Sequence, residues 1–208
     1  MFKIIILNNY TNKYWNLLMF TTRLKPLSLL LCLCILLQVL FAFTYKIEDP
    51  NARLQQKMNK AISDLFNAKE IKLEQVSVPK DIQKEMNFQA ETDFIYGIKI
   101  DDKLEAFAYL GQANSMKDVF DYLVILNTDL NILKSKVLIY REQHGRQIGS
   151  QRWLKQFIGM DTSSQPKLGE NIQGISGATI SARSMTQATH QVLNNLGYLA
   201  EHKLLLNE

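Results

Sequence analysis

The residues best suited to chemistry lie in one short stretch, residues 174–184, where two glycines and several hydroxyl side chains precede a helical pattern. The first backbone N–H groups of a helix lack partners within it and carry the positive end of the helix dipole, so they favour a bound anion. Small residues let an anion approach the backbone, and hydroxyls donate hydrogen bonds to its oxygens. The stretch therefore predicts a phosphate site, formed by Ser176, Gly177, Ala178, Thr179 and Ser181, with Ile180 as a further ligand-binding residue of the same stretch.

Two other roles for these residues follow from their types. The Thr179 hydroxyl can form a covalent ester with a phosphate. The hydroxyls can instead form an ordinary helix cap, because Ser or Thr before a helix is common and usually structural. In each case a helix must follow. Apolar residues recur at helical spacing through Met185, Val192 and Leu196, and the pattern predicts that this helix stops at Gly197.

The segments before this helix predict an α+β fold, in which an antiparallel sheet of hairpins has an N-terminal helix and a C-terminal helix that follows the phosphate-binding turn. A repeat of three and four predicts the N-terminal helix over residues 50–66. Alternating apolar residues and turn signals predict a strand and two hairpins, at residues 71–78, 93–100 with 103–110, and 118–126 with 132–140. Both faces of the last hairpin are apolar, so its strands are expected to be central and covered on each side.

Composition excludes several classes of function. The chain has 24 basic and 20 acidic residues, but four of the basic ones and none of the acidic ones fall in the first 45 positions. The remaining body is neutral and shows no nucleic-acid-binding footprint. Both cysteines, Cys32 and Cys34, also lie in those first positions, so the body has no disulfide, Cys-ligated iron–sulfur cluster or thioether-linked haem. Its three histidines are too scattered to predict a metal site.

Residues 1–45 predict a targeting segment rather than part of the fold. Arg23 and Lys25 precede an apolar run over residues 27–43, which is typical of a secretory signal peptide or a single membrane anchor. Basic residues before the run keep the N-terminus inside, so the body is expected to be extracytoplasmic, in the periplasm. The sequence leaves open whether the segment is cleaved and whether Met1 or Met19 is the start. We predict targeting in residues 1–45, a packing helix and strand in 46–89, and the functional domain in 90–208.

The Ser-Gly-Ala-Thr motif at residues 176–179, followed by Ile-Ser, resembles the flavin-attachment motif of the FMN-binding domain family. That family includes flavin-carrying subunits of the sodium-pumping NADH:quinone oxidoreductase and Rnf complexes, and the periplasmic domain of NosR-type regulators. The resemblance extends over about residues 90–196. It includes a hairpin, a strand ending in a Tyr/His-x-Glu-x-x-Gly type segment, an aromatic-containing helix and the final turn. The matching pieces are residues 120–126, 136–145, 153–159 and 174–181.

The resemblance implies FMN as the cofactor and a flavin transferase as a partner. In the family, the transferase links FMN by a phosphoester to the last Thr of the motif, which is Thr179 here. The family usually has Asp three residues before the first Ser or Thr, and this chain has Gln173 there. A Gln supplies no carboxylate to the transferase or to a metal. Covalent and non-covalent FMN therefore both stay open.

The remaining contacts of FMN are predicted from residue type between the second hairpin and the phosphate turn. Apolar candidates for its isoalloxazine ring are Ile148, Trp153 and Phe157, which can equally be plain core. Polar candidates for the ring edge are Glu142 and His144, which can equally lie in a solvated loop. No metal site is predicted from that Glu and His, because the spacing has no third ligand nearby.

The resemblance favours an extracytoplasmic FMN-binding protein, with or without a covalent bond, that carries electrons between redox partner proteins in the membrane. No dinucleotide-binding glycine motif is present, so the chain is expected to accept electrons from a partner rather than from a nicotinamide. One alternative is a flavin-dependent reductase of a soluble or metal-chelate substrate, which needs an open pocket at the ring. Another is a non-redox sensor or interaction module on the same fold.

Overall fold

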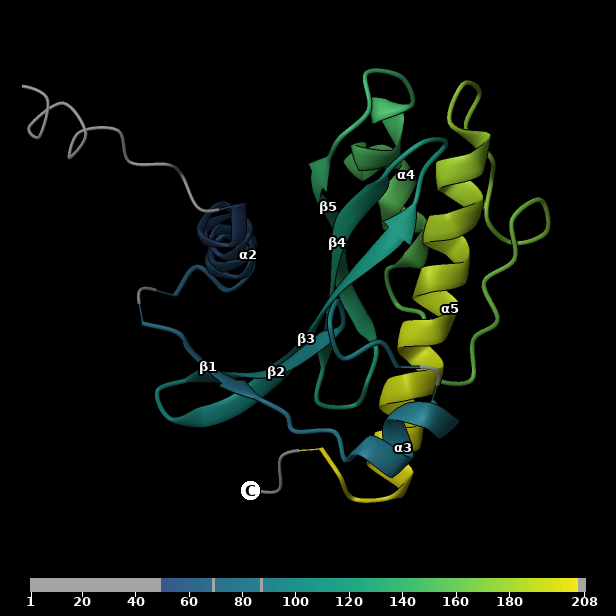
Figure 1. Ribbon diagram of the computed structural model, residues 1–208. Helices are drawn as coiled ribbons and strands as arrows, with labels where there is room; N and C mark the ends of the chain where they lie inside the picture. Colours follow the sequence, from purple (N-terminus) through teal and green to yellow (C-terminus); the bar gives the residue numbers. More distant parts are fainter. Residues whose placement is uncertain (1–49, 69, 87, 206–208) are drawn as a thin grey trace, which may run out of the picture. The chain divides into compact units, whose positions relative to one another are not determined.

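The computed structural model describes residues 50–68, 70–86 and 88–205, and in them the predicted hairpins form one five-stranded antiparallel sheet (Figure 1). The strands lie side by side in chain order: β1 (Lys72–Gln75), β2 (Phe94–Ile100), β3 (Lys103–Asn114), β4 (Val119–Asn127) and β5 (Ile132–Tyr140). Asp101 and Asp102 both have a left-handed φ, of 50° and 62°, which suits the tight turn between β2 and β3. The predicted α+β class and antiparallel sheet are confirmed.

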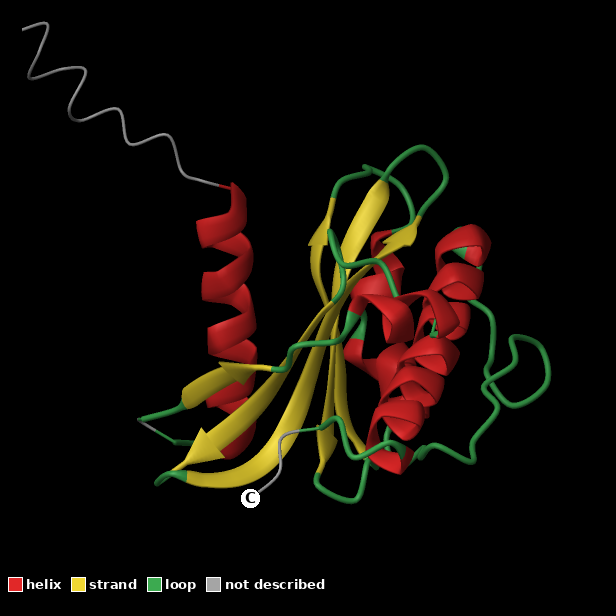
Figure 2. Cartoon of the chain, turned by 60° about the horizontal axis from the view of Figure 1, so that its bottom comes forward, coloured by secondary structure: helices red, strands yellow, loops and turns green. Residues whose placement is uncertain are grey.

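Helices cover both faces of this sheet (Figure 2). On one face lies α2 (Pro50–Phe66), whose fully buried Met58, Ala61 and Ile62 form a core with residues of β2 to β5. On the other face lie α5 (Thr179–Glu201), α3 (Lys80–Glu85), α4 (Gln151–Leu154) and the 3₁₀ turn η2 (Lys155–Phe157). Because β4 is buried along nearly its whole length, the expectation that both its faces are covered is confirmed.

The strand boundaries differ from the prediction in three places. The strand predicted at residues 71–78 corresponds to β1, which is shorter than predicted and pairs only with β2. The strand predicted to end at residue 110 continues as β3 to Asn114, because β4 pairs with its additional residues. The prediction that β5 is a central strand is wrong, because β5 is the last strand of the sheet.

The predicted end of the last helix at Gly197 is wrong, because α5 continues to Glu201. A Cβ at position 197 would lie 3.2 Å from the side chain of Thr162. Glycine here lets the loop after η2 pack closely against the helix, and it does not act as a C-cap. Leu199, beyond the glycine, is fully buried, so packing holds the last turn in place.

The N-terminal predictions fall outside the described residues. The targeting segment at residues 1–45, with its apolar run at 27–43, belongs to the part of the chain that is not described. No helix within residues 50–205, leaving aside 69 and 87, is both long enough and apolar enough to cross a membrane. The boundaries at 45/46 and 89/90 stay a prediction.

Candidate functional site

Three segments that are distant in the sequence meet at one end of the sheet. They are the tip between β3 and β4, the loop after β5, and the turn that leads into α5, all at the upper end of Figure 1. Together they line a cleft of about 230 Å³. Its lining residues are Met116, Tyr140, Glu142, His144, Gly145, Gly177, Ala178, Thr179, Ile180 and Ser181.

The start of α5 has no side-chain cap. Its N-cap residue is Ala178, which offers no oxygen to the first amides of the helix. The first intrahelical bond runs from the Ala182 amide to the Ala178 carbonyl, so the amides before it have no helical acceptor. The interpretation of this stretch as an ordinary Ser or Thr cap is therefore wrong. The uncapped amides are free to bind an anion in the cleft.

The turn before the helix exposes the residues that a phosphate would need. Gly177 has a left-handed φ of 77°, and nothing lies within 4 Å of where its Cβ would be, so the backbone is open to a ligand. Ser176 and Thr179 are exposed. Ser181 differs, because it is buried and its hydroxyl lies 3.0 Å from that of Tyr140. Ser176 lies in the turn but does not line the cleft.

The loop after β5 is fitted closely against this turn at Gly145. Gly145 is buried and has a left-handed φ of 79°. A Cβ there would lie 2.6 Å from the Tyr140 hydroxyl and 3.6 Å from both the Ala178 Cβ and the Gly177 carbonyl oxygen. Only glycine fits this position without displacing its neighbours. Gly145 and Tyr140 therefore position the turn from behind.

Glu142 holds the tip between β3 and β4. Its Oε1 accepts hydrogen bonds from the Lys117 amide at 2.7 Å, the Asp118 amide at 3.2 Å and the Ser115 hydroxyl. These bonds, led by that from the Lys117 amide, lower the pKa of Glu142 below its ordinary value. Glu142 and His144 were predicted at the polar edge of a flavin ring. Both line the cleft, but the Glu142 carboxylate is already engaged by the tip.

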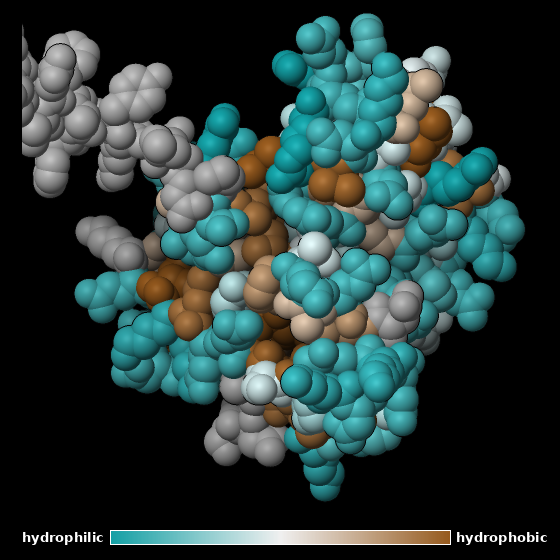
Figure 3. Space-filling model, in the orientation of Figure 1, coloured by the Kyte–Doolittle hydropathy of each residue, from teal (hydrophilic) through white to brown (hydrophobic). Residues whose placement is uncertain are grey.

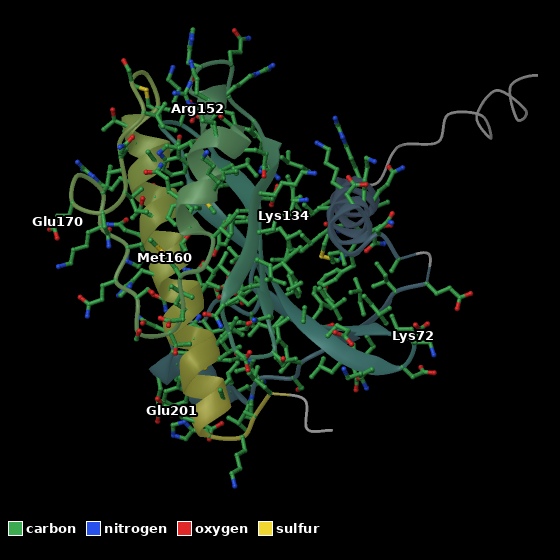
Figure 4. All side chains as sticks on the ribbon, turned by 180° about the vertical axis from the view of Figure 1, so that it is seen from behind. Lys72, Lys134, Arg152, Met160, Glu170 and Glu201 are labelled. Atoms are coloured by element: carbon green, nitrogen blue, oxygen red, sulfur yellow. The ribbon has the colours of Figure 1, made fainter. Side chains whose placement is uncertain are left out.

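The turn is also held from its other side by the short helix α4. Trp153 Nε1 donates to the Gln173 carbonyl at 2.6 Å, and the Gln173 amide donates to the Gln156 side chain at 2.9 Å. A second cleft, of about 400 Å³, lies here and is lined by Trp153, Gly174, Ile175 and the basic residues Arg152 and Lys155, among others. Figure 4 labels Arg152 at this end of the domain. The turn before α5 thus lies between two clefts.

Two of the predicted ring contacts belong to the core instead. Ile148, in the 3₁₀ turn η1 (Arg146–Gly149), and Phe157, in η2, are both fully buried. Neither lines either cleft beside the turn, so neither presents a surface to a ring. Trp153 packs edge-on against Phe157 and reaches the second cleft with only 7% of its surface exposed. The plain-core alternative therefore holds for Ile148 and Phe157.

The sequence analysis missed Met116, Tyr140 and Gly145 as residues of the cleft. The glycine had a signal, since a glycine in a charged loop after a strand often marks a left-handed turn. Met116 had none, because nothing local places the β3–β4 tip beside α5. Within the described residues, no group of three or more His, Cys, Asp or Glu side chains is placed to hold a metal ion.

A family model described as the FMN-binding domain matches residues 80–194, which include both the cleft and the turn before α5. No curated protein matches the chain. The matched range overlaps the 90–196 range of the resemblance noted in the sequence, and it covers more than half of the chain.

Proposed function

The chain belongs to the FMN-binding domain family, and on that premise we propose that it is an extracytoplasmic flavoprotein that carries electrons between redox partners. The observation that carries this proposal is the uncapped start of α5, which opens onto a cleft inside the matched range. Free amides, an open glycine and an exposed hydroxyl at one helix start fit a phosphate monoester. The residues present therefore fit FMN, whose phosphate they would hold.

Thr179 is the residue we propose as the covalent attachment point. It is the first residue of α5, it is exposed, and it lines the cleft. In the transfer, the Thr179 oxygen forms a bond to the phosphorus of FMN and its proton passes to a base of the transferase. The bond from the same phosphorus to the donor's leaving group would break, so the donor must hold FMN through a phosphoanhydride, whose second phosphate would leave.

Gln173 is the main departure from the family motif, and the structure makes its effect testable. Its side chain is exposed, whereas its backbone is fixed by Trp153 and Gln156. A change at this side chain therefore leaves the turn in place. We infer that Gln173 affects recognition by the transferase and has little effect on the binding of FMN itself.

Bound FMN supplies the redox chemistry, and the protein supplies binding, orientation and the exclusion of water. In the cleft, the amides at the start of α5 orient the phosphate end. Electron carriers meet their partners through small, transient contacts. We propose membrane-bound partners on the extracytoplasmic side, supported by the basic residues and the apolar run of the N-terminal segment.

A reductase is the second candidate, and the cleft beside Trp153 favours it. Its volume of about 400 Å³ suits a small substrate, and Arg152 and Lys155 give it positive charge. Such an enzyme would pass electrons directly to a soluble anionic acceptor. Stopped-flow mixing of the reduced protein with a ferric chelate separates the two functions. A reductase reoxidises at a rate that saturates with chelate concentration and falls in R152A, whereas a carrier does not.

The proposed function is tested by expressing the full chain with and without a flavin transferase and measuring intact mass and flavin absorbance. We expect a mass gain of one FMN with the transferase, which T179A loses and T179S, which keeps the hydroxyl, retains. Q173D restores the family carboxylate and should raise the modified fraction. Yellow protein of unchanged mass would contradict attachment at Thr179 but support FMN binding. Colourless protein under both conditions would overturn the proposal.

A further inference from the structure

Two exposed apolar side chains line the cleft of about 230 Å³ beside the start of α5. Among the described residues, the large apolar side chains that are most exposed are Met116 at 70%, Ile158 at 53% and Ile180 at 51%. Single exposed apolar residues need no explanation. Two of these three, however, come from different segments and line the same cleft as Thr179. Small brown patches interrupt the hydrophilic surface at the upper end of Figure 3.

The position of Met116 is fixed by the backbone around it. The Ser115 amide and hydroxyl both bond the Asp118 carbonyl at 2.7 Å, which closes the tip of the β3–β4 hairpin. The Glu142 carboxylate then binds this tip from the loop after β5, through the Lys117 and Asp118 amides. A hairpin tip held by a carboxylate from another segment presents its exposed side chain at a defined place.

A flavin needs an apolar surface as well as a phosphate site, because its ring system is flat and largely apolar. The core position of Ile148 and Phe157 removes them as candidates. Ile180 follows directly after Thr179, so it lies beside any phosphate held at the start of α5. Met116 lines the same cleft from the hairpin tip.

We propose that Met116 and Ile180 form the apolar seat of the isoalloxazine ring, and that Glu142 is the positioning residue that holds Met116 there. This inference rests on the proposed function, because it concerns the ring of the same FMN. A methionine thioether makes favourable contacts with aromatic rings, and its flexible side chain adapts to a flat surface. The seat and the phosphate turn are separate subsites that can be tested separately.

The test uses the full chain, expressed without a flavin transferase and titrated with FMN and with riboflavin, which has the ring but no phosphate. Affinity is read from quenching of flavin fluorescence. M116S and I180S should each weaken binding of both flavins by about two- to tenfold, because each replaces one apolar contact with the ring by a polar side chain. M116L should stay within about twofold of wild type, because it keeps the apolar volume. I158S, which removes an exposed apolar residue outside the cleft, should change neither affinity.

The phosphate subsite gives the matched comparison. G177V should weaken FMN binding more than riboflavin binding, because the branched side chain obstructs the phosphate, whereas the backbone strain at its left-handed φ affects both flavins alike. E142Q should weaken the binding of both flavins, because it displaces the hairpin tip that carries Met116. The losses of binding free energy in E142Q and I180S should add in the double mutant. Unchanged affinities of M116S and I180S for both flavins would overturn the seat and keep the proposed function. Failure of wild type to bind either flavin without the transferase would overturn the seat, and the proposed function would fall as well if the chain also gained no FMN with the transferase.

Discussion

Replacing Gly145 by alanine tests the close fit behind the turn before α5. The new Cβ would lie 2.6 Å from the Tyr140 hydroxyl, a separation at which one of the two must move. The left-handed φ of 79° adds a backbone cost of about 1–2 kcal/mol for a residue with a Cβ. Displacing Tyr140, with its bond to Ser181, costs about 1–3 kcal/mol as overpacking. We therefore expect G145A to lower the free energy of unfolding by about 2–5 kcal/mol.

Gly159 provides the matched control. Its φ of 83° is equally left-handed, but nothing lies within 4 Å of where its Cβ would be. G159A should therefore lose only the backbone cost of about 1–2 kcal/mol. The difference between the two variants measures the steric clash alone. Urea unfolding followed by far-UV circular dichroism measures it, provided that the slope with urea is unchanged.

A double mutant identifies the atom responsible. Y140F removes the hydroxyl that the new methyl group meets, at the cost of about 1 kcal/mol for its bond to Ser181. In the double mutant G145A/Y140F the clash is gone. The free energy of unfolding lost in the double mutant should therefore be about 1–2 kcal/mol smaller than the sum of the losses in the two single mutants. Equal losses in G145A and G159A, or strict additivity in the double mutant, would refute the argument that Gly145 supports the turn through Tyr140.

Two further predictions concern the other supports of the site. W153F removes the Nε1 bond to the Gln173 carbonyl and part of a buried ring. The free energy of unfolding in urea should therefore fall by about 1–3 kcal/mol, and FMN affinity should fall with it. Unchanged values for both would show that the turn needs no support from α4. For Glu142 the folded pKa is below its ordinary value of 4.5, so the carboxylate stabilises the fold at neutral pH and loses that contribution as the pH falls through the folded pKa. E142Q should therefore unfold at lower urea than wild type at neutral pH, and the gap should close in acid; a gap independent of pH would contradict this role.

The elements could be predicted from the sequence because their signals are local. The strands of both hairpins, the helix α2 and the start of α5 each follow from periodicity and turn residues within a few positions. The end of α5 could not be predicted in this way. Gly197 is a proper stop signal by residue type, and only the contact with Thr162 shows that it serves close packing.

The candidate site was predictable in part, for the same reason. The turn before α5 is one continuous segment, and its glycine and hydroxyls identify it directly. The ring contacts depend on burial, which residue type does not reveal. Ile148 and Ile180 are both isoleucines, yet Ile148 is fully buried and Ile180 is 51% exposed. Glu142 was predicted to contact a ring, and it lines the cleft while it also binds the β3–β4 tip, a partner that no local pattern indicates.

The start of α5 is where the chain departs from the rules that stabilise a helix. A Ser, Thr or Asp at the N-cap is worth about 1 kcal/mol over the alanine found at position 178. Hydroxyls are present at Ser176 and Thr179, on either side of it, but neither occupies the cap. Meanwhile Gly145, Tyr140 and Trp153 hold the turn in place from two sides. A helix end that is rigidly supported but left uncapped lacks that stabilisation in the free protein, and a ligand bound to its amides, as we propose for FMN, would supply it.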